Sequence, residues 1–228
     1  MDIQKGIKLQ KLIRYVTDTT TEHYLKNDAQ HGVAHRDYVA KRAAMFAKQS
    51  TKQVDQKSVF VGAMFHDAGH HIDPQNHETV SAQMCVDDKT LKVHLRDNGV
   101  YDEEIYEIAR GIADHRASLK GEPRNEIGRI ISSADRRVDL TDFLKSMYTY
   151  RAQNCPQMSG IEIIEDSWNY MSRKFGNNGY ALKKMYFKDP AYEALIQQVK
   201  QLASDKQLFM TMFSQIIANC NKSSENLA

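Results

Sequence analysis

The stretch Phe60–His70, FVGAMFHDAGH, decides how this chain is expected to fold. Its first half is almost entirely apolar, which favours a buried helix that Gly69 ends. His66 and Asp67 lie three and four residues after Ala63, so they fall on the apolar face of that helix. A histidine and an aspartate are therefore expected side by side in the protein interior.

The same helical spacing of apolar residues continues through most of the chain. Eleven glycines and four prolines in 228 residues are few helix breakers, which disfavours an all-β fold with many turns. The connection Gly176–Pro190 is the longest expected non-helical segment and a candidate lid or boundary. Asp102 is expected to cap one helix, and Gly99 to close another. Besides the helix within residues 59–69, the spacing predicts helices near residues 36–49, 80–85, 91–98, 102–112, 127–138, 161–175 and 191–217.

Four more polar residues share the apolar faces of predicted helices. A buried carboxylate has to be paired or to bind a metal ion, because desolvating it alone is very costly. One buried histidine is usually a hydrogen-bonded core residue, but six such polar residues on five helices favour a metal site. Nitrogen and oxygen ligands without a thiolate suit Mn, Fe, Zn, Ni or Co. The four additional residues are His35 (four before Val39), His77 (three before Val80), His115 (three after Ile112) and Asp135 (four after Ile131).

Composition excludes several other classes of protein. Lys+Arg 31 against Asp+Glu 29 gives a net charge of +2, which argues against a nucleic-acid-binding protein held by a basic field. Three widely spaced cysteines form neither a disulfide framework nor a zinc ribbon. The nucleotide-binding loops, the GxSxG elbow and the HExxH motif are missing. No signal peptide or membrane-spanning stretch is evident, so a soluble cytoplasmic protein is expected.

The ordered set His35, His66–Asp67, Asp135 resembles the H…HD…D signature of the HD-domain superfamily of metal-dependent phosphohydrolases. The similarity covers about His31–Leu144 and is greatest to small stand-alone bacterial members. The segments that carry it are HGVAHRDYVAKRAAMFA (31–47), FVGAMFHDAGH (60–70), NHETVSAQMC (76–85), IARGIADHRAS (108–118) and IISSADRRVDL (130–140).

The resemblance implies an all-α, HD-domain-like helical bundle with additional C-terminal helices. We expect a single helical domain over residues 1–228, with a core over about 25–145 and an extension over about 146–220. In such a domain His35, His66, Asp67 and Asp135 bind one divalent transition metal ion. His77 and His115 are candidates for a second metal site or for a phosphate contact. His94 is a weaker substitute for His77, and His70 is a candidate to line the pocket.

The implied activity is hydrolysis of a nucleotide or another small phosphoester by attack of a metal-bound water. Asp67 is the expected catalytic residue, which orients the water or accepts its proton. Arg116 and Arg136 are the nearest candidate cations for the substrate, because each neighbours an expected ligand.

Two specific substrates of the superfamily are disfavoured by the sequence. The guanosine-tetraphosphate hydrolases carry an acidic pair shortly after HD, whereas residues 68–71 read AGHH. The cyclic-di-GMP phosphodiesterases carry a GYP segment that this chain lacks. The expected partner is a small phosphorylated molecule, with no role for a membrane and none favoured for nucleic acid.

Two other functions stay open, as do the number of ions and the oligomeric state. Some relatives of this fold use the set H…HD…H…H…D to hold a diiron centre for oxygenation. A non-catalytic module would keep the metal site for sensing or assembly. A late apolar stripe is expected to be core more than the face of a homodimer; its members are Leu208, Phe209, Met212, Phe213 and Ile216.

Overall fold

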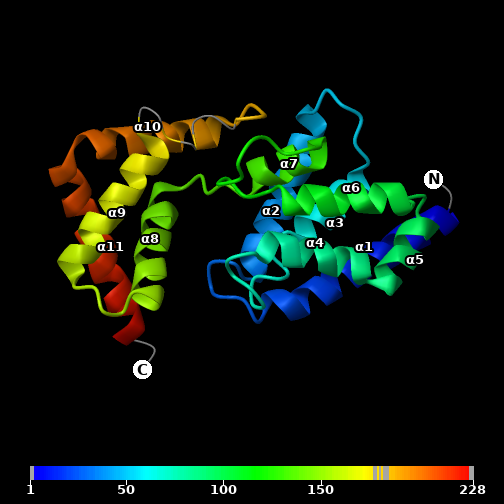
Figure 1. The fold of residues 1–228 in the computed structure, drawn as a ribbon, viewed down its shortest axis with the longest axis horizontal. Helices are drawn as coiled ribbons and strands as arrows, with labels where there is room; N and C mark the ends of the chain where they lie inside the picture. Colours follow the sequence, from blue (N-terminus) through cyan, green and yellow to red (C-terminus); the bar gives the residue numbers. More distant parts are fainter. Residues whose placement is uncertain (1–2, 177–178, 180, 182–184, 226–228) are drawn as a thin grey trace. The chain divides into compact units, whose positions relative to one another are not determined.

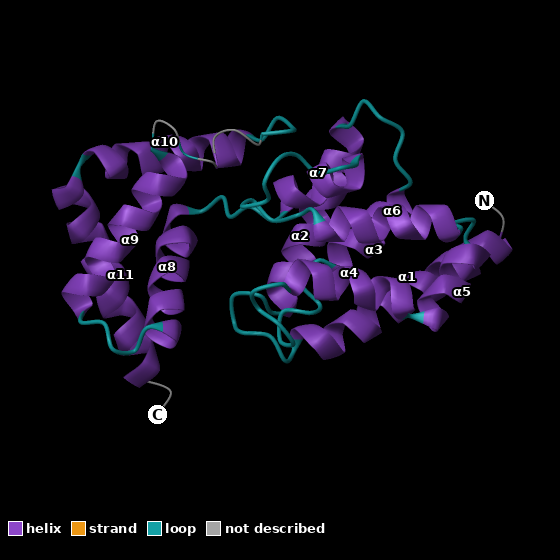
Figure 2. Ribbon diagram, in the orientation of Figure 1, coloured by secondary structure: helices purple, strands orange, loops and turns teal. Residues whose placement is uncertain are grey.

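The structure is a computed structural model that describes residues 3–176, 179, 181 and 185–225, with side chains as far as residue 220. Over this part of the chain the regular elements are helices and no strand is present (Figures 1 and 2). The predicted all-α fold is confirmed. None of the described helices is both long and apolar enough to cross a bilayer. The chain divides into two compact units, Met1–Asp135 and Arg136–Ala228; the single domain with core and extension stays a prediction.

The first unit is a bundle built from seven of the described helices. α6 packs against α4, α3 and α7, and α2 packs against α3 and α7, while α1 contacts α5, α3 and α2. Its fully buried apolar side chains come from most of these helices and include Leu12, Phe46, Phe65, Leu91 and Ile108. The helices are α1 Ile3–Tyr24, α2 Val33–Gln49, α3 Gln56–Phe65, α4 His77–Asp87, α5 Lys89–Asp97, α6 Asp102–Ala113 and α7 Glu126–Ala134.

Helix α3 is shorter than expected from the sequence. It ends at Phe65 rather than at Gly69, because the chain then closes a series of tight turns. The Ala68 N–H donates to the Phe65 carbonyl and the His70 N–H to the Asp67 carbonyl, both at 3.0 Å. The Asp102 prediction was also wrong in detail: Tyr101 occupies the N-cap of α6, and Asp102 is the first helical residue.

One close helix crossing brings the ends of α6 and α7 together. A Cβ atom on Gly111 of α6 would lie 2.7 Å from Ile127 Cγ2 and 3.0 Å from the backbone nitrogen of Gly128. These distances are shorter than a real side chain tolerates, so only glycine lets α6 and α7 approach this closely. The crossing places the end of α6, and Asp114 that follows it, against the first turn of α7.

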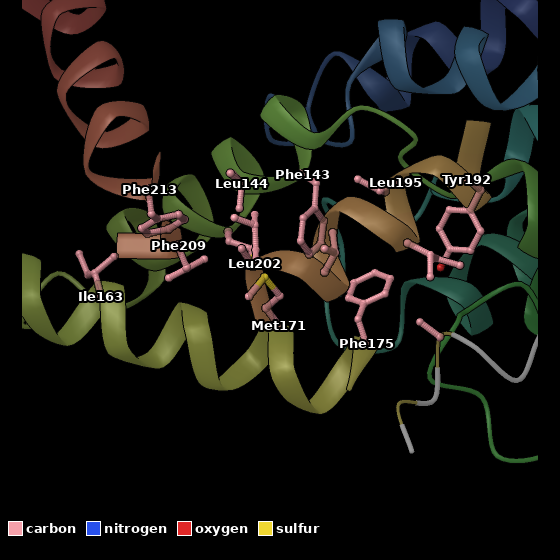
Figure 3. Packing of buried hydrophobic residues seen from close by; sticks show 14 residues of the cluster. Phe143, Leu144, Ile163, Met171, Phe175, Tyr192, Leu195, Leu202, Phe209 and Phe213 are labelled. Atoms are coloured by element: carbon pink, nitrogen blue, oxygen red, sulfur yellow. The ribbon is translucent and has the colours of Figure 1, made fainter. Parts of the chain in front are cut away.

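The second unit buries an apolar core of its own (Figure 3). Phe209 and Phe213 are completely buried there, and Leu208, Met212 and Ile216 pack against them, so the late stripe is core as predicted. Its helices are α8 Leu140–Asn154, α9 Gly160–Phe175, α10 Pro190–Ser204 and α11 Lys206–Glu225.

The single helix expected over residues 191–217 is two helices. Asp205 breaks it, because its backbone is extended and its side chain accepts the Leu208 N–H at 2.9 Å. That hydrogen bond satisfies a free N–H at the start of α11, as an N-cap does. The expected connection Gly176–Pro190 lies partly outside the described residues.

Candidate metal centre

The six polar residues singled out from the sequence lie at helix ends. Long helices with these residues on shared faces were expected, and that expectation is wrong for the residues that lie beyond helix ends. Because helix ends from different parts of the chain meet in the bundle, the side chains still converge. His35 lies in the first turn of α2, His66 and Asp67 follow α3, His77 begins α4, His115 follows α6, and Asp135 follows α7.

Four of these residues form what we name the first ligand group: His35, His66, Asp67 and Asp135. One potential ligand atom from each lies within 4.8 Å of all the others. The Nε2 atom of His35 lies 3.0 Å from Asp135 Oδ1 and 3.2 Å from His66 Nε2. His66 Nε2 lies 3.2 Å from Asp67 Oδ2. Two imidazoles and two carboxylates therefore point at one small volume.

Asp67, His77 and His115 form the second ligand group. Asp67 Oδ1 lies 3.1 Å from His77 Nε2 and 3.4 Å from His115 Nε2. The other carboxylate oxygen, Oδ2, faces His35 and His66 of the first group. Asp67 is thus shared between the groups, with one oxygen directed at each, which is the arrangement of a bridging carboxylate.

The backbone orients three of the histidine rings. The Nδ1 atoms of His66 and His115 lie 2.7 Å from the carbonyls of Ala63 and Ile112. That of His77 lies 3.0 Å from the Pro74 carbonyl. A carbonyl only accepts, so Nδ1 carries a proton in each ring and Nε2 is the atom turned toward Asp67. Such a bond to the far nitrogen is the usual support of a metal-binding histidine.

The donor set fits a divalent metal ion. Asp67 is only 2% exposed, yet its Oδ1 atom accepts no hydrogen bond. A buried carboxylate oxygen without a partner is costly unless a cation satisfies it. Neutral imidazole and carboxylate ligands suit the borderline transition metals. The described residues could therefore hold an ion at the first group, and a second ion at the group that shares Asp67.

The ionisation of the ion-free site points the same way. Burial works against protonation of His35, but hydrogen bonds with Asp135 and Asp67 outweigh it and raise the pKa of His35 to about 9. Burial would raise the pKa of Asp67, but the surrounding histidines, His66 foremost, hold it well below its usual range. The pKa of Asp135 is also lowered, against its burial, chiefly by His35. A proton on His35 thus partly supplies the positive charge that an ion would bring.

Gly69 fixes the second group, because α4 packs directly on the turn after Asp67. A Cβ atom on Gly69 would lie 2.8 Å from Val80 Cβ and 2.9 Å from the backbone nitrogen of Ser81. The Gly69 N–H donates to Ser81 Oγ at 2.9 Å. This contact keeps the start of α4, and therefore His77, beside Asp67.

A third group of potential ligands, Asp28, His31 and His70, lies next to the other two. The His31 ring stacks on His70 at 4.0 Å, and Asp28 Oδ1 lies 2.9 Å from His31 Nδ1. His70 also lies near His77, with 5.3 Å between ring centroids, and its role in lining the site stays a prediction. Asp28 and His31 were missed. The signal that could have found His31 is its position four residues before His35.

The remaining candidates have other contacts. Arg116 Nη1 donates to the Gln75 carbonyl at 2.6 Å and lies 3.2 Å from Glu78, so it is engaged at the start of α4. Arg136 belongs to the second unit, where its guanidinium lies over the Tyr192 ring. The ring of His94 contacts Tyr15 and is not part of the ligand groups among the described residues. The substrate roles of both arginines stay predictions.

Comparison with known proteins gives one match. The family model of the HD domain matches residues 32–141. No curated protein matches the chain. No solved structure matches it either. The matched segment contains both the first and the second ligand group.

Proposed function

The chain belongs to the HD-domain superfamily through residues 32–141, and on that premise we propose that it is a metal-dependent phosphohydrolase. The proposed substrate is a nucleotide or another small phosphoester. The observation that carries the proposal is the convergence of two ligand groups on one buried carboxylate, Asp67. A small substrate is favoured over nucleic acid because the net charge of the chain is only +2.

His35, His66, Asp67 and Asp135 would hold the first ion. When bound, a divalent ion polarises a phosphoryl oxygen and lowers the pKa of a water ligand. Within this group Asp135 is the most accessible member, with its side chain 26% exposed against 3% for Asp67. Substrate would therefore enter on the side of Asp135.

The role of Asp67 depends on how many ions the protein holds. With one ion, Oδ1 faces His77 and His115 without a hydrogen bond and is placed to accept a proton from the attacking water. With two ions, Asp67 would help to hold both and would orient the reaction without taking the proton. Elemental analysis of protein purified without added metal distinguishes one ion per chain from two.

The test compares Asp67→Ala with Asp97→Ala, which changes an exposed aspartate in the last turn of α5. Both proteins are stripped of metal, reloaded with Mn²⁺ and assayed on p-nitrophenyl phosphate and a panel of nucleotides. We expect Asp67→Ala to lose bound metal and phosphatase activity, and Asp97→Ala to keep both. Full phosphatase activity in Asp67→Ala would contradict the proposed function.

A diiron oxygenase is the second candidate, and the sharing of Asp67 between two ligand groups is the observation that favours it. It requires iron in both groups and His77 and His115 as ligands. Anaerobic loading with Fe²⁺ followed by measurement of oxygen uptake on exposure to air tests it. Sustained substrate-dependent uptake without phosphatase activity would replace the first proposal.

A further inference from the structure

Tyr24 contacts two predicted metal ligands from outside the ligand groups. It is the last residue of α1, before the segment that matches the HD domain, and it is 1% exposed. Its hydroxyl oxygen accepts the backbone N–H of Asp67 at 3.0 Å and lies 3.1 Å from His66 Nδ1. Burial, followed by the charge of Asp67, raises the pKa of Tyr24 well above its usual value, so the hydroxyl stays neutral.

Asn27, in the turn after α1, holds the other side of the same residue. Its Nδ2 atom donates to the Asp67 carbonyl at 3.0 Å and to the His31 carbonyl at 2.9 Å. Its Oδ1 atom accepts the His71 N–H at 2.9 Å. One amide side chain therefore joins three segments around the site.

These contacts matter because Asp67 lies beyond the end of α3. The regular hydrogen bonds of a helix do not fix its backbone there, and the turn supplies only the His70 N–H to the Asp67 carbonyl. The Asp67 N–H is held by Tyr24 and its carbonyl by Asn27 as well. Two side chains, one from the end of α1 and one from the turn after it, thus form hydrogen bonds with the peptide groups that orient the Asp67 carboxylate.

Tyr24 is itself held in place by a buried arginine on α2. The guanidinium of Arg36 lies over the Tyr24 ring, 5.8 Å from its centroid. Arg36 Nη1 also donates to the Thr20 and Thr21 hydroxyls of α1, at 3.1 and 2.6 Å. The position of the Tyr24 hydroxyl is therefore determined by α1 and α2 together, and not by the ligand groups alone.

We infer that Tyr24 and Asn27 are positioning residues of the metal centre, which set its affinity and ligand geometry through the backbone of Asp67 and the ring of His66. Partners of this kind behind the ligands typically contribute 10–100-fold to metal affinity. The inference rests on the proposed metal site but not on the proposed reaction.

The experiment measures Co²⁺ binding and the visible Co²⁺ spectrum of the full chain. Tyr24→Phe removes only the hydroxyl and keeps the ring in the core. Tyr15→Phe is the matched control, because Tyr15 is on the same helix and its hydroxyl donates to Asp88 at 2.9 Å, away from the ligand groups. We expect the Co²⁺ dissociation constant to rise at least about tenfold in Tyr24→Phe, with an altered spectrum, and to be unchanged in Tyr15→Phe.

Asn27→Asp keeps the inference testable if Tyr24→Phe does not fold. It preserves size and the acceptor for the His71 N–H, but it replaces the donor to Asp67 by an oxygen, and the same loss of affinity is expected. Wild-type affinity and spectrum in either folded variant overturn the inference alone. Wild-type protein without Co²⁺ binding overturns both the inference and the metal site. Weakened Co²⁺ binding in the variants, with no wild-type phosphatase activity, supports the inference and overturns only the proposed reaction.

Discussion

The interiors of the two units differ in chemistry. The second unit buries an aromatic and aliphatic cluster (Figure 3). Its buried arginines have simple partners: Arg151 pairs with Asp166 at 2.8 Å, and Arg136 lies over Tyr192. The first unit buries His66, Asp67 and His115 almost completely, within one cluster of histidines and aspartates. The second unit shows that helices pack around an interior without such a cluster. The polar interior of the first unit is therefore explained by binding chemistry more than by folding.

The largest expected effect is a loss of folding stability that leaves metal binding unchanged. Phe209 is fully buried and stacks on Phe213 at 5.1 Å, so Phe209→Ala should cost about 3–5 kcal/mol of unfolding free energy. Urea unfolding followed by fluorescence of Trp168, the single tryptophan of the chain, reports on the second unit directly. Co²⁺ affinity of the folded variant should match that of wild type.

Its counterpart in the first unit is Asp135→Asn, which keeps the size of the side chain. We expect it to lower Co²⁺ affinity by more than the 10–100-fold typical of residues behind the ligands, with no change in the Trp168 unfolding midpoint. The proposed difference between the two interiors is wrong if Phe209→Ala lowers Co²⁺ affinity as much as Asp135→Asn does.

A smaller effect is the pH dependence of metal binding. The pKa of His35 is raised to about 9 in the ion-free protein, from 6.5 ordinarily, so His35 stabilises the ion-free fold fully below pH 6.5 and loses that contribution as pH rises through about 9. The ion has to displace this proton. Its apparent affinity should therefore rise about tenfold per pH unit below about pH 9.

Co²⁺ titrations between about pH 6.5 and 8.5 measure this slope. His94→Gln is the control, because His94 is on α5 and contacts Tyr15 rather than the ligand groups, so its slope should equal that of wild type. A flat affinity across this range in wild type would mean that binding displaces no proton from His35.

The helices of the first unit could largely be predicted because apolar residues recur at helical spacing. Helix α1 was not predicted, since its buried face consists of Leu12, Val16, Thr20 and Tyr24, a sparse stripe that includes a hydroxyl. The same spacing continued past the ends of α3, α6 and α7, and so it placed His66, Asp67, His115 and Asp135 on helices that end before them.

The site residues could be chosen from the sequence, but not their contacts. The six predicted residues do converge, because polar groups buried in one small bundle are costly unless they are paired. Tyr24 and Asn27 carried no such signal: their hydrogen bonds to Asp67 span 43 and 40 residues and depend on how α1 packs. The same holds for Asp28, whereas His31 could have been found from its position four residues before His35.

The smallest expected effect compares two helix caps. Asn125 begins α7, where its side chain accepts the Gly128 N–H at 2.9 Å, and Ser159 begins α9, where it accepts the Glu162 N–H at 3.3 Å. Each change to alanine should cost about 1 kcal/mol of unfolding free energy. Far-UV circular dichroism follows Asn125→Ala and Trp168 fluorescence follows Ser159→Ala.

The two variants should differ in metal binding. Helix α7 carries Asp135 at its C-terminal end, so loosening its start lets that ligand shift, and Asn125→Ala should weaken Co²⁺ binding a few-fold. Helix α9 carries none of the ligand-group residues, so Ser159→Ala should leave affinity unchanged. Equal affinities in the two variants would mean that Asp135 is held by the site itself and not by its helix. In that event contacts among the ligands keep the metal centre rigid, and the helices only bring the ligands close together.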